Sequence, residues 1–195
     1  MRYEVPRDHP LRRLFRWATH EAFRQLKDLA DEQVETYISE EILGELVHID
    51  RIYWLRNAQG KRLTDLAEMV MERRGTATNG FERELEVNQH IGDLALFTAG
   101  LFPEGLNRKP PPTMPLVAQV GEVLVPCSRQ LDYYVAEGKS AYQRASELWR
   151  RLSRPRSVLF GRLSDRFEEY VGAMSLIRAY LREDPYFRRC EDALG

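Results

Sequence analysis

Apolar residues recur at three- and four-residue intervals along most of this chain, and this spacing constrains its fold more than any other feature. The segment "LRRLFRWATHEAFRQLKDL", residues 11–29, shows the pattern clearly. Such spacing places the apolar side chains on one face of an α-helix, and that face must be buried against another element. The sequence therefore predicts an all-α fold.

Clusters of glycine, asparagine and proline divide the chain into about six helices with short connections. Asp31 is expected to cap the second helix, and "SRPRS" is expected to separate the last two. The expected helices cover roughly residues 10–29, 31–50, 65–74, 79–100, 128–152 and 164–182. The sequence thus predicts a single-domain helical bundle over residues 1–195.

The segment from about residue 102 to 127 interrupts the helical pattern. Its three consecutive prolines cannot lie inside a helix, so we expect a long Pro-rich crossover loop, with a short hairpin in "LVAQVGEVLVPC". "KPPPTMP" fits a pattern read by polyproline-binding domains, although a stiff surface crossover explains it equally well. The candidate partner patch comprises Leu101, Phe102, Pro110, Pro111, Pro112 and Pro115.

The overall charge balance excludes some kinds of partner. The net charge is −1, so no global field attracts nucleic acid or an anionic membrane surface. No apolar run is long enough to cross a membrane, and the N-terminus lacks a signal-peptide core. The two cysteines lie far apart and suggest reduced thiols. We therefore expect a cytoplasmic protein that binds neither nucleic acid nor membrane.

The most unusual stretch is "HIGDLALFTAGLFPEGL", residues 90–106. From Leu94 onward its helix is apolar all round, which is typical of a helix enclosed by neighbours. Small residues such as Gly92 would let another helix approach closely, and the helix over 128–152 offers small residues in return, among them Gly138. We expect a buried central helix here, with a packing reason for Gly138.

Glu45 and His48 form a Glu-x-x-His pair on the second helix, with Glu45 projecting into an apolar stripe. Pairs of this kind help to build carboxylate-bridged di-iron sites. The fourth helix carries a second group of polar residues, although not at the same spacing. The candidate ligands for iron or manganese are Glu45, His48, Glu86, His90 and Asp93. Alternatively, Glu45 accepts hydrogen bonds from a Tyr, Arg or His, and Asp93 is tied to an Arg or a helix N-terminus.

The segments at 90–104 and 133–142 resemble a group of bacterial all-helical proteins without a known activity. In that group a His-x-Gly-Asp segment, a Phe-Pro-Glu end and a later Tyr…Gly-Lys-x-Ala-Tyr segment recur. The resemblance extends over most of residues 30–182 and implies a pocket near His90, Asp93 and Gly138–Lys139. The candidate pocket residues, which could hold a small apolar ligand, are Phe97, Tyr134, Gly138, Lys139 and Tyr142.

No set of residues forms a recognisable reactive constellation. The chain has four histidines, and neither a Cys-His nor a Ser-His-Asp arrangement can be argued from their positions. The leading hypothesis is therefore a non-enzymatic helical interaction or regulatory module without a cofactor, which binds a protein partner or self-associates. The alternatives are a metal-dependent, di-iron-like oxidase or oxygenase and a carrier of a small apolar ligand.

Overall fold

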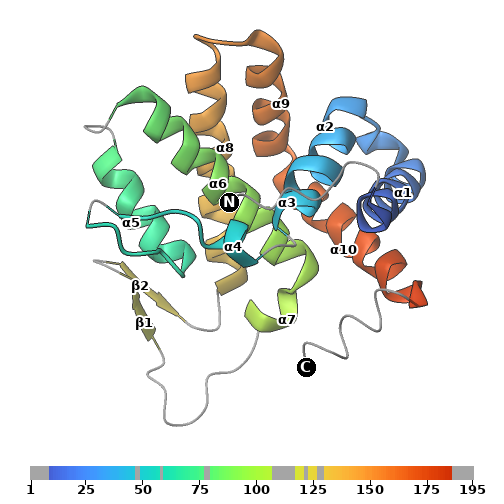
Figure 1. Ribbon diagram of the computed structural model, residues 1–195, viewed down its shortest axis with the longest axis horizontal. Coiled ribbons are helices and arrows are strands. Elements are labelled where there is room, and N and C mark those ends of the chain that lie inside the picture. Colours follow the sequence, from blue (N-terminus) through green and yellow to red (C-terminus); the bar gives the residue numbers. More distant parts are fainter. Residues whose placement is uncertain are drawn as a thin grey trace.

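The computed structural model describes residues 9–46, 49–57, 59–76, 80–106, 117–120, 123–126 and 130–185. It confirms the all-α bundle (Figure 1). In chain order the elements are α1 (Pro10–Gln25), η1 (Lys27–Leu29), α2 (Glu32–Thr36), η2 (Tyr37–Leu43), α3 (Gly44–Leu46), α4 (Ile49–Ile52), α5 (Leu66–Thr76), α6 (Phe81–Leu101), α7 (Pro103–Leu106), β1 (Val117–Val120), β2 (Val123–Pro126), α8 (Gln130–Trp149), α9 (Arg154–Asp165) and α10 (Phe167–Glu183).

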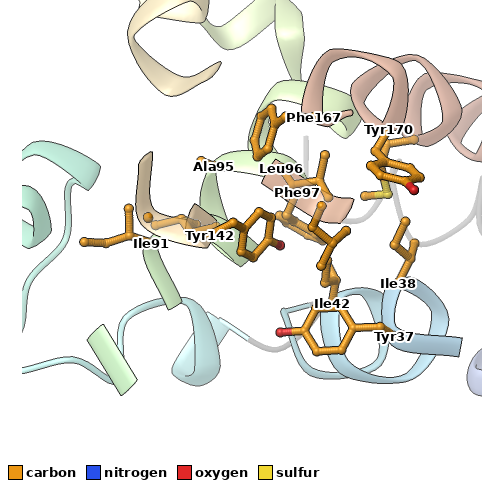
Figure 2. Close-up of a cluster of buried hydrophobic side chains, with 14 of the residues drawn as sticks. Tyr37, Ile38, Ile42, Ile91, Ala95, Leu96, Phe97, Tyr142, Phe167 and Tyr170 are labelled. Carbon is orange, nitrogen blue, oxygen red and sulfur yellow. The ribbon is translucent and has the colours of Figure 1, made fainter. Parts of the chain in front are cut away.

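Helix α6 crosses the middle of the molecule, with α5 on one side and α10 on the other (Figure 1). It is buried along most of its length, as the all-round apolar pattern predicted. Its buried side chains include Val87, His90, Ile91, Ala95 and Leu96. The same core contains side chains from η2, α8 and α10, among them those drawn in Figure 2.

Glycines permit the close approach of α6 to its neighbours. A Cβ atom on Gly92 would lie 2.4 Å from the ring of Tyr142 on α8. A Cβ atom on Gly138 would lie 2.4 Å from Phe167 and 2.9 Å from the Cβ of Ala95. Both distances are far below ordinary van der Waals contact, so only glycine fits. The expected packing role of Gly138 is confirmed.

The segment "SRPRS" does not simply end a helix, as expected, but begins another one. Helix α9 starts directly after Ser153, with Pro155 in its first turn, where the absent N–H has no intrahelical partner to lose. A turn at Arg166 then separates α9 from α10. The single last helix expected over 164–182 is thus replaced by an α9–α10 pair.

The expected helix over 31–50 is also more complex than its apolar pattern suggested. Asp31 caps α2 as predicted, because its Oδ1 accepts hydrogen bonds from the N–H groups of Gln33 and Val34. The chain then enters a π-helix, η2, before it returns to α-geometry in α3. A π-helix closes i→i+5 hydrogen bonds, so residues after η2 face other directions than a regular α-helix predicts.

Strands β1 and β2 pair antiparallel, from Val117 opposite Pro126 to Val120 opposite Val123. They lie in the part of the crossover where the sequence allowed a hairpin. Pro110, Pro111, Pro112 and Pro115 lie outside the described residues, so the expected polyproline patch stays a prediction.

Candidate functional site

Asp93, on α6, is held by two tyrosine hydroxyls from different elements. Tyr37, the first residue of the π-helix, donates to both carboxylate oxygens at 2.9 and 3.1 Å. Tyr142 on α8 donates to Oδ1 at 2.8 Å. Both tyrosines lie within the core (Figure 2). The carboxylate is thus tied to two tyrosines and not, as expected, to an arginine or a helix N-terminus.

Burial raises the pKa of Asp93 to about 7 from an ordinary value of 3.8. The two tyrosine hydrogen bonds lower this pKa, and the nearby charge of Glu41 raises it. Among the described residues, no arginine, lysine or histidine forms an ion pair with Asp93. The positive charge of Arg156 on α9 is the smallest of these influences and also lowers this pKa. Asp93 therefore changes its charge near neutral pH with only weak compensation from a cation.

His90 lies one turn before Asp93 on α6, and both of its ring nitrogens are engaged. Its Nδ1 accepts a hydrogen bond from the indole N–H of Trp54 at 3.0 Å, and its Nε2 lies 2.9 Å from the carbonyl oxygen of Ile52. Because a carbonyl only accepts, Nε2 carries the proton and the ring is neutral. Burial lowers the pKa of His90 to about 4, which keeps it neutral. His90 thereby satisfies a carbonyl at the end of α4.

Asp93 and His90 open onto a cavity of about 270 Å³, which we call the Asp93 pocket. Its walls come from the π-helix, from the chain around α4 and from one face of α6. The described lining residues are Tyr37, Glu41, Glu45, Arg51, Trp54, Glu86, Gln89, His90 and Asp93. The pocket is therefore polar, and carboxylates outnumber cations among the described residues that line it.

Glu45 converges with His90 and Asp93 on this pocket, but not from an apolar stripe as expected. It ion-pairs with Arg12 at 3.1 Å and with Arg51 at 3.2 Å, and its side chain is 33% exposed. The π-helix explains the difference, because it changes the phase of the helix just before Glu45. The alternative expectation, that an arginine across the bundle would donate to Glu45, is confirmed by Arg12 on α1.

The candidate metal ligands are only partly brought together. Glu45, Glu86, His90 and Asp93 all line the Asp93 pocket, whereas His48 lies outside the described residues. Within the described part of the chain, no three His, Cys, Asp or Glu side chains are grouped as metal ligands. Moreover, His90 has no free ring nitrogen, and Glu86 ion-pairs with Arg83 at 3.3 Å. The donor geometry of the described residues therefore does not favour iron or manganese.

The five candidate residues for an apolar ligand do not surround one cavity. Tyr142 turns its hydroxyl to Asp93, and Gly138 is covered by Phe167. Lys139 points to the surface and ion-pairs with Glu168 at 2.9 Å. Phe97 packs against Phe102, and Tyr134 against Tyr133. Gly138, near which the resemblance implied a pocket, instead allows close packing of α8 against its neighbours.

The described part of the candidate partner patch is divided between core and surface. Leu101 is buried at the end of α6, so it is not available to a partner. Phe102 is 49% exposed, with its ring beside that of Phe97. Of this patch, Phe102 is the described residue that remains accessible.

Five residues that line the Asp93 pocket were not among the candidates predicted from the sequence. They are Tyr37, Glu41, Arg51, Trp54 and Gln89. One signal could have found Tyr37 and Trp54. A carboxylate and a histidine on a helix expected to be buried need hydrogen-bond partners, and Tyr and Trp supply donors from an apolar body.

No family model matches this chain, and the searches of curated proteins and of solved structures found no match either. The resemblance of residues 90–104 and 133–142 to a group of bacterial proteins therefore stays an expectation. None of the helices formed by described residues has both the length and the apolar character needed to cross a membrane.

Proposed function

We propose that this protein is a non-enzymatic regulatory module whose Asp93 pocket binds a small organic cation. The observation that carries the proposal is Asp93, a carboxylate in the pocket wall with two tyrosine donors and no ion-pair partner among the described residues. Ionising such a group inside a protein lowers stability. Proteins retain such unfavourable groups mainly at functional sites, and a bound cation supplies the missing charge.

The donor arrangement favours an organic cation over a metal ion. Magnesium and calcium require several oxygen ligands at short distances. No three candidate ligands are grouped in that way among the described residues, whereas an ammonium or guanidinium group is satisfied by one or two carboxylates. A cavity of about 270 Å³ suits a compact molecule, because pockets for drug-sized ligands have volumes of roughly 300–1,000 Å³.

The pocket is better suited to binding than to covalent chemistry. The described lining residues include no Ser, Thr, Cys or Lys that could serve as a nucleophile. The neutral ring of His90 is held on both sides by Trp54 and Ile52, so it is not free to accept a proton from a ligand. Asp93 then acts as an anchor for positive charge.

A ligand at this site would influence several segments at once. Tyr37 belongs to the π-helix, Trp54 to the chain after α4 and Asp93 to α6, and all three line the pocket. A molecule that contacts all of them stabilises their mutual packing by binding only the folded arrangement. This coupling supports a regulatory role.

We also propose that the module works in the cytoplasm with a protein partner or a second copy of itself. The exposed apolar side chains of Leu152, between α8 and α9, and Val158, on α9, support a contact surface at that end of the bundle. Sedimentation analysis over a range of concentrations tests self-association. A monomer at every concentration would leave a different protein as the partner, and the absence of any specific complex would contradict the proposed mode of action.

Thermal denaturation at pH 8 tests the binding proposal, since Asp93 is then mostly ionised. The probes are n-butylamine and methylguanidine, with Mg²⁺ for comparison, against the wild type, Asp93→Asn and the exposed Asp165→Asn as the matched control. We expect an organic cation to raise the melting temperature of the wild type and of Asp165→Asn, but not of Asp93→Asn. An equal shift in all three proteins, no shift at all, or a shift with Mg²⁺ alone would refute the proposal.

A further inference from the structure

A second hollow, of about 510 Å³, lies beside the Asp93 pocket. It is bounded by α2 and the π-helix on one side and by the first turns of α9 on the other. We call it the α9 groove, and it is lined by Glu32, Gln33, Thr36, Tyr37, Glu40, Glu41, Pro155, Arg156 and Leu159. Tyr37 and Glu41 line both hollows. The two spaces therefore adjoin at the π-helix.

Two carboxylates near this junction, Asp93 and Glu41, form no ion pair with a described residue. Glu40 is neutralised by Arg12 and Arg16, just as Glu45 is neutralised by arginines. By contrast, Glu41 has no ion pair with any described residue, and it is exposed where the two hollows meet. Its charge also acts on Asp93. Asp93 and Glu41 are thus two anionic positions at adjoining hollows that share Tyr37 and Glu41 in their walls.

The wall of the α9 groove next to Glu41 is partly apolar. Tyr37, Pro155 and Leu159 contribute carbon surface. The positive charge in the groove belongs to Arg156, whose guanidinium lies 5.2 Å from the centre of the Trp149 ring. A ligand with positive ends and an apolar middle matches the two carboxylates and the carbon surface of Tyr37 better than a single compact charge does, provided that its second charge stays on the Glu41 side of the groove, away from Arg156.

We propose that the ligand is a linear aliphatic diamine. One ammonium group ion-pairs with Asp93 inside the Asp93 pocket, the second pairs with Glu41 at the junction, and the methylene chain lies against Tyr37. This inference rests on the proposed function and specifies its ligand class.

Calorimetric titration at pH 8 with 1,4-diaminobutane and n-butylamine tests the diamine proposal separately from the proposed binding of an organic cation. One additional ion pair of about 1.4 kcal/mol would make the diamine bind about tenfold more tightly than the monoamine. Glu41→Gln should reduce diamine binding to the level of n-butylamine and leave n-butylamine itself unaffected. Asp93→Asn should weaken both, and Glu183→Gln, at an exposed position on α10, should change neither.

The possible outcomes distinguish failure of the diamine proposal from failure of the proposed function. Equal affinities for the two amines, both lost in Asp93→Asn, would refute the diamine and leave the proposed function standing. Diamine binding that is undiminished in Glu41→Gln would likewise overturn the inference. If neither amine binds but methylguanidine stabilises the wild type through Asp93, the ligand is a guanidinium compound. Failure of all three probes would refute both proposals.

Discussion

Helix α6 presents glycines to one set of neighbours and ionisable side chains to another, and the two sides are built differently. Toward α8 and α10, Gly92 and Gly100 leave no room for even one additional carbon atom. Toward the π-helix and Trp54, His90 and Asp93 border a cavity. Close packing of apolar groups stabilises the fold, whereas a cavity beside a half-buried carboxylate does not. The face of α6 toward the π-helix, which we call its polar side, therefore carries residues whose presence stability alone does not explain. The face toward α8 and α10 is its packed side.

The sharpest test of this difference is Asp93→Asn. A carboxyl pKa raised from 3.8 to about 7 means that the folded state favours the protonated form. Its stabilising contribution is complete below pH 3.8 and is lost as the pH rises through 7. The neutral amide avoids this loss, so we expect the variant to be more stable than the wild type at pH 8, by at most about 4 kcal/mol.

Urea denaturation at pH 4 and pH 8 measures the effect of Asp93→Asn, with Asp165→Asn as the control. The stability gained by Asp93→Asn over the wild type should nearly vanish at pH 4, because the wild-type carboxyl is then protonated. A variant that is less stable than the wild type at pH 8 would show that the ionised carboxylate is well compensated, and the two sides of α6 would no longer differ in this respect.

His90 provides a second test, because its effect on stability changes with pH in the opposite direction to that of Asp93. Its pKa is lowered to about 4 from 6.5, so its stabilising contribution is present above pH 6.5 and is lost as the pH falls toward 4. In the wild type the gain in stability from His90 with rising pH opposes the loss from Asp93 over nearly the same pH range. In Asp93→Asn the opposing trend is absent, and His90 by itself should raise the free energy of unfolding by about 3 kcal/mol from pH 4 to pH 6.5. Glutamates with lowered pKa values, such as Glu68 and Glu168, act in the same direction. A flat profile for this variant, measured by urea denaturation, would contradict the neutral, buried state of His90.

The packed side of α6 is tested by Gly92→Ala. The added methyl group would meet the Tyr142 ring at 2.4 Å, so we expect a loss of about 2 kcal/mol in the free energy of unfolding. Gly172→Ala on α10 is the matched control, because a Cβ atom there has no neighbour within 4 Å. That control should gain up to about 1 kcal/mol from helix propensity. Equal effects of the two substitutions would show that close approach does not determine the glycine at position 92.

The smallest expected changes in stability come from removing the hydroxyl groups of Tyr37 and Tyr142, which donate to Asp93. Tyr37→Phe and Tyr142→Phe each remove one donor to Asp93, and each should lower stability at pH 8 by about 1 kcal/mol. Both bonds lower the pKa of Asp93, that of Tyr142 more strongly, so Tyr142→Phe should raise this pKa further than Tyr37→Phe. Titration of the Asp93 carboxyl by carbon NMR checks the order, and the reverse order would contradict this assignment.

The packed side of α6 could largely be predicted from the sequence. Small residues on two apolar helices predict close approach, and Gly92 and Gly138 make the expected kind of contact. Such reasoning works because helical periodicity directly reports which residues face a neighbour. It was wrong for α9, because a proline that breaks a helix interior also suits a first turn.

For the polar side of α6, the sequence predicted which residues belong to the site, but not how they are arranged or which partners they contact. Glu45, Glu86, His90 and Asp93 were identified as candidates, and they line one pocket. Their partners were not foreseen, because Tyr37 and Trp54 come from segments whose orientation depends on the π-helix and on the chain around α4. Regular α-helical periodicity carries no information about such a local change of winding.

The π-helix has a consequence for how this site could arise or disappear. A π-turn is equivalent to an α-turn that has accepted one additional residue. Removing one of the polar residues from the span Tyr37–Leu43 would restore regular winding without altering the apolar composition of the core. Tyr37 and Glu41 would then be rotated relative to one another, and the carboxylate of Asp93 would lose one of its donors. Deletion or insertion of one codon could therefore remove or create the proposed binding site in related proteins that keep the same helical bundle.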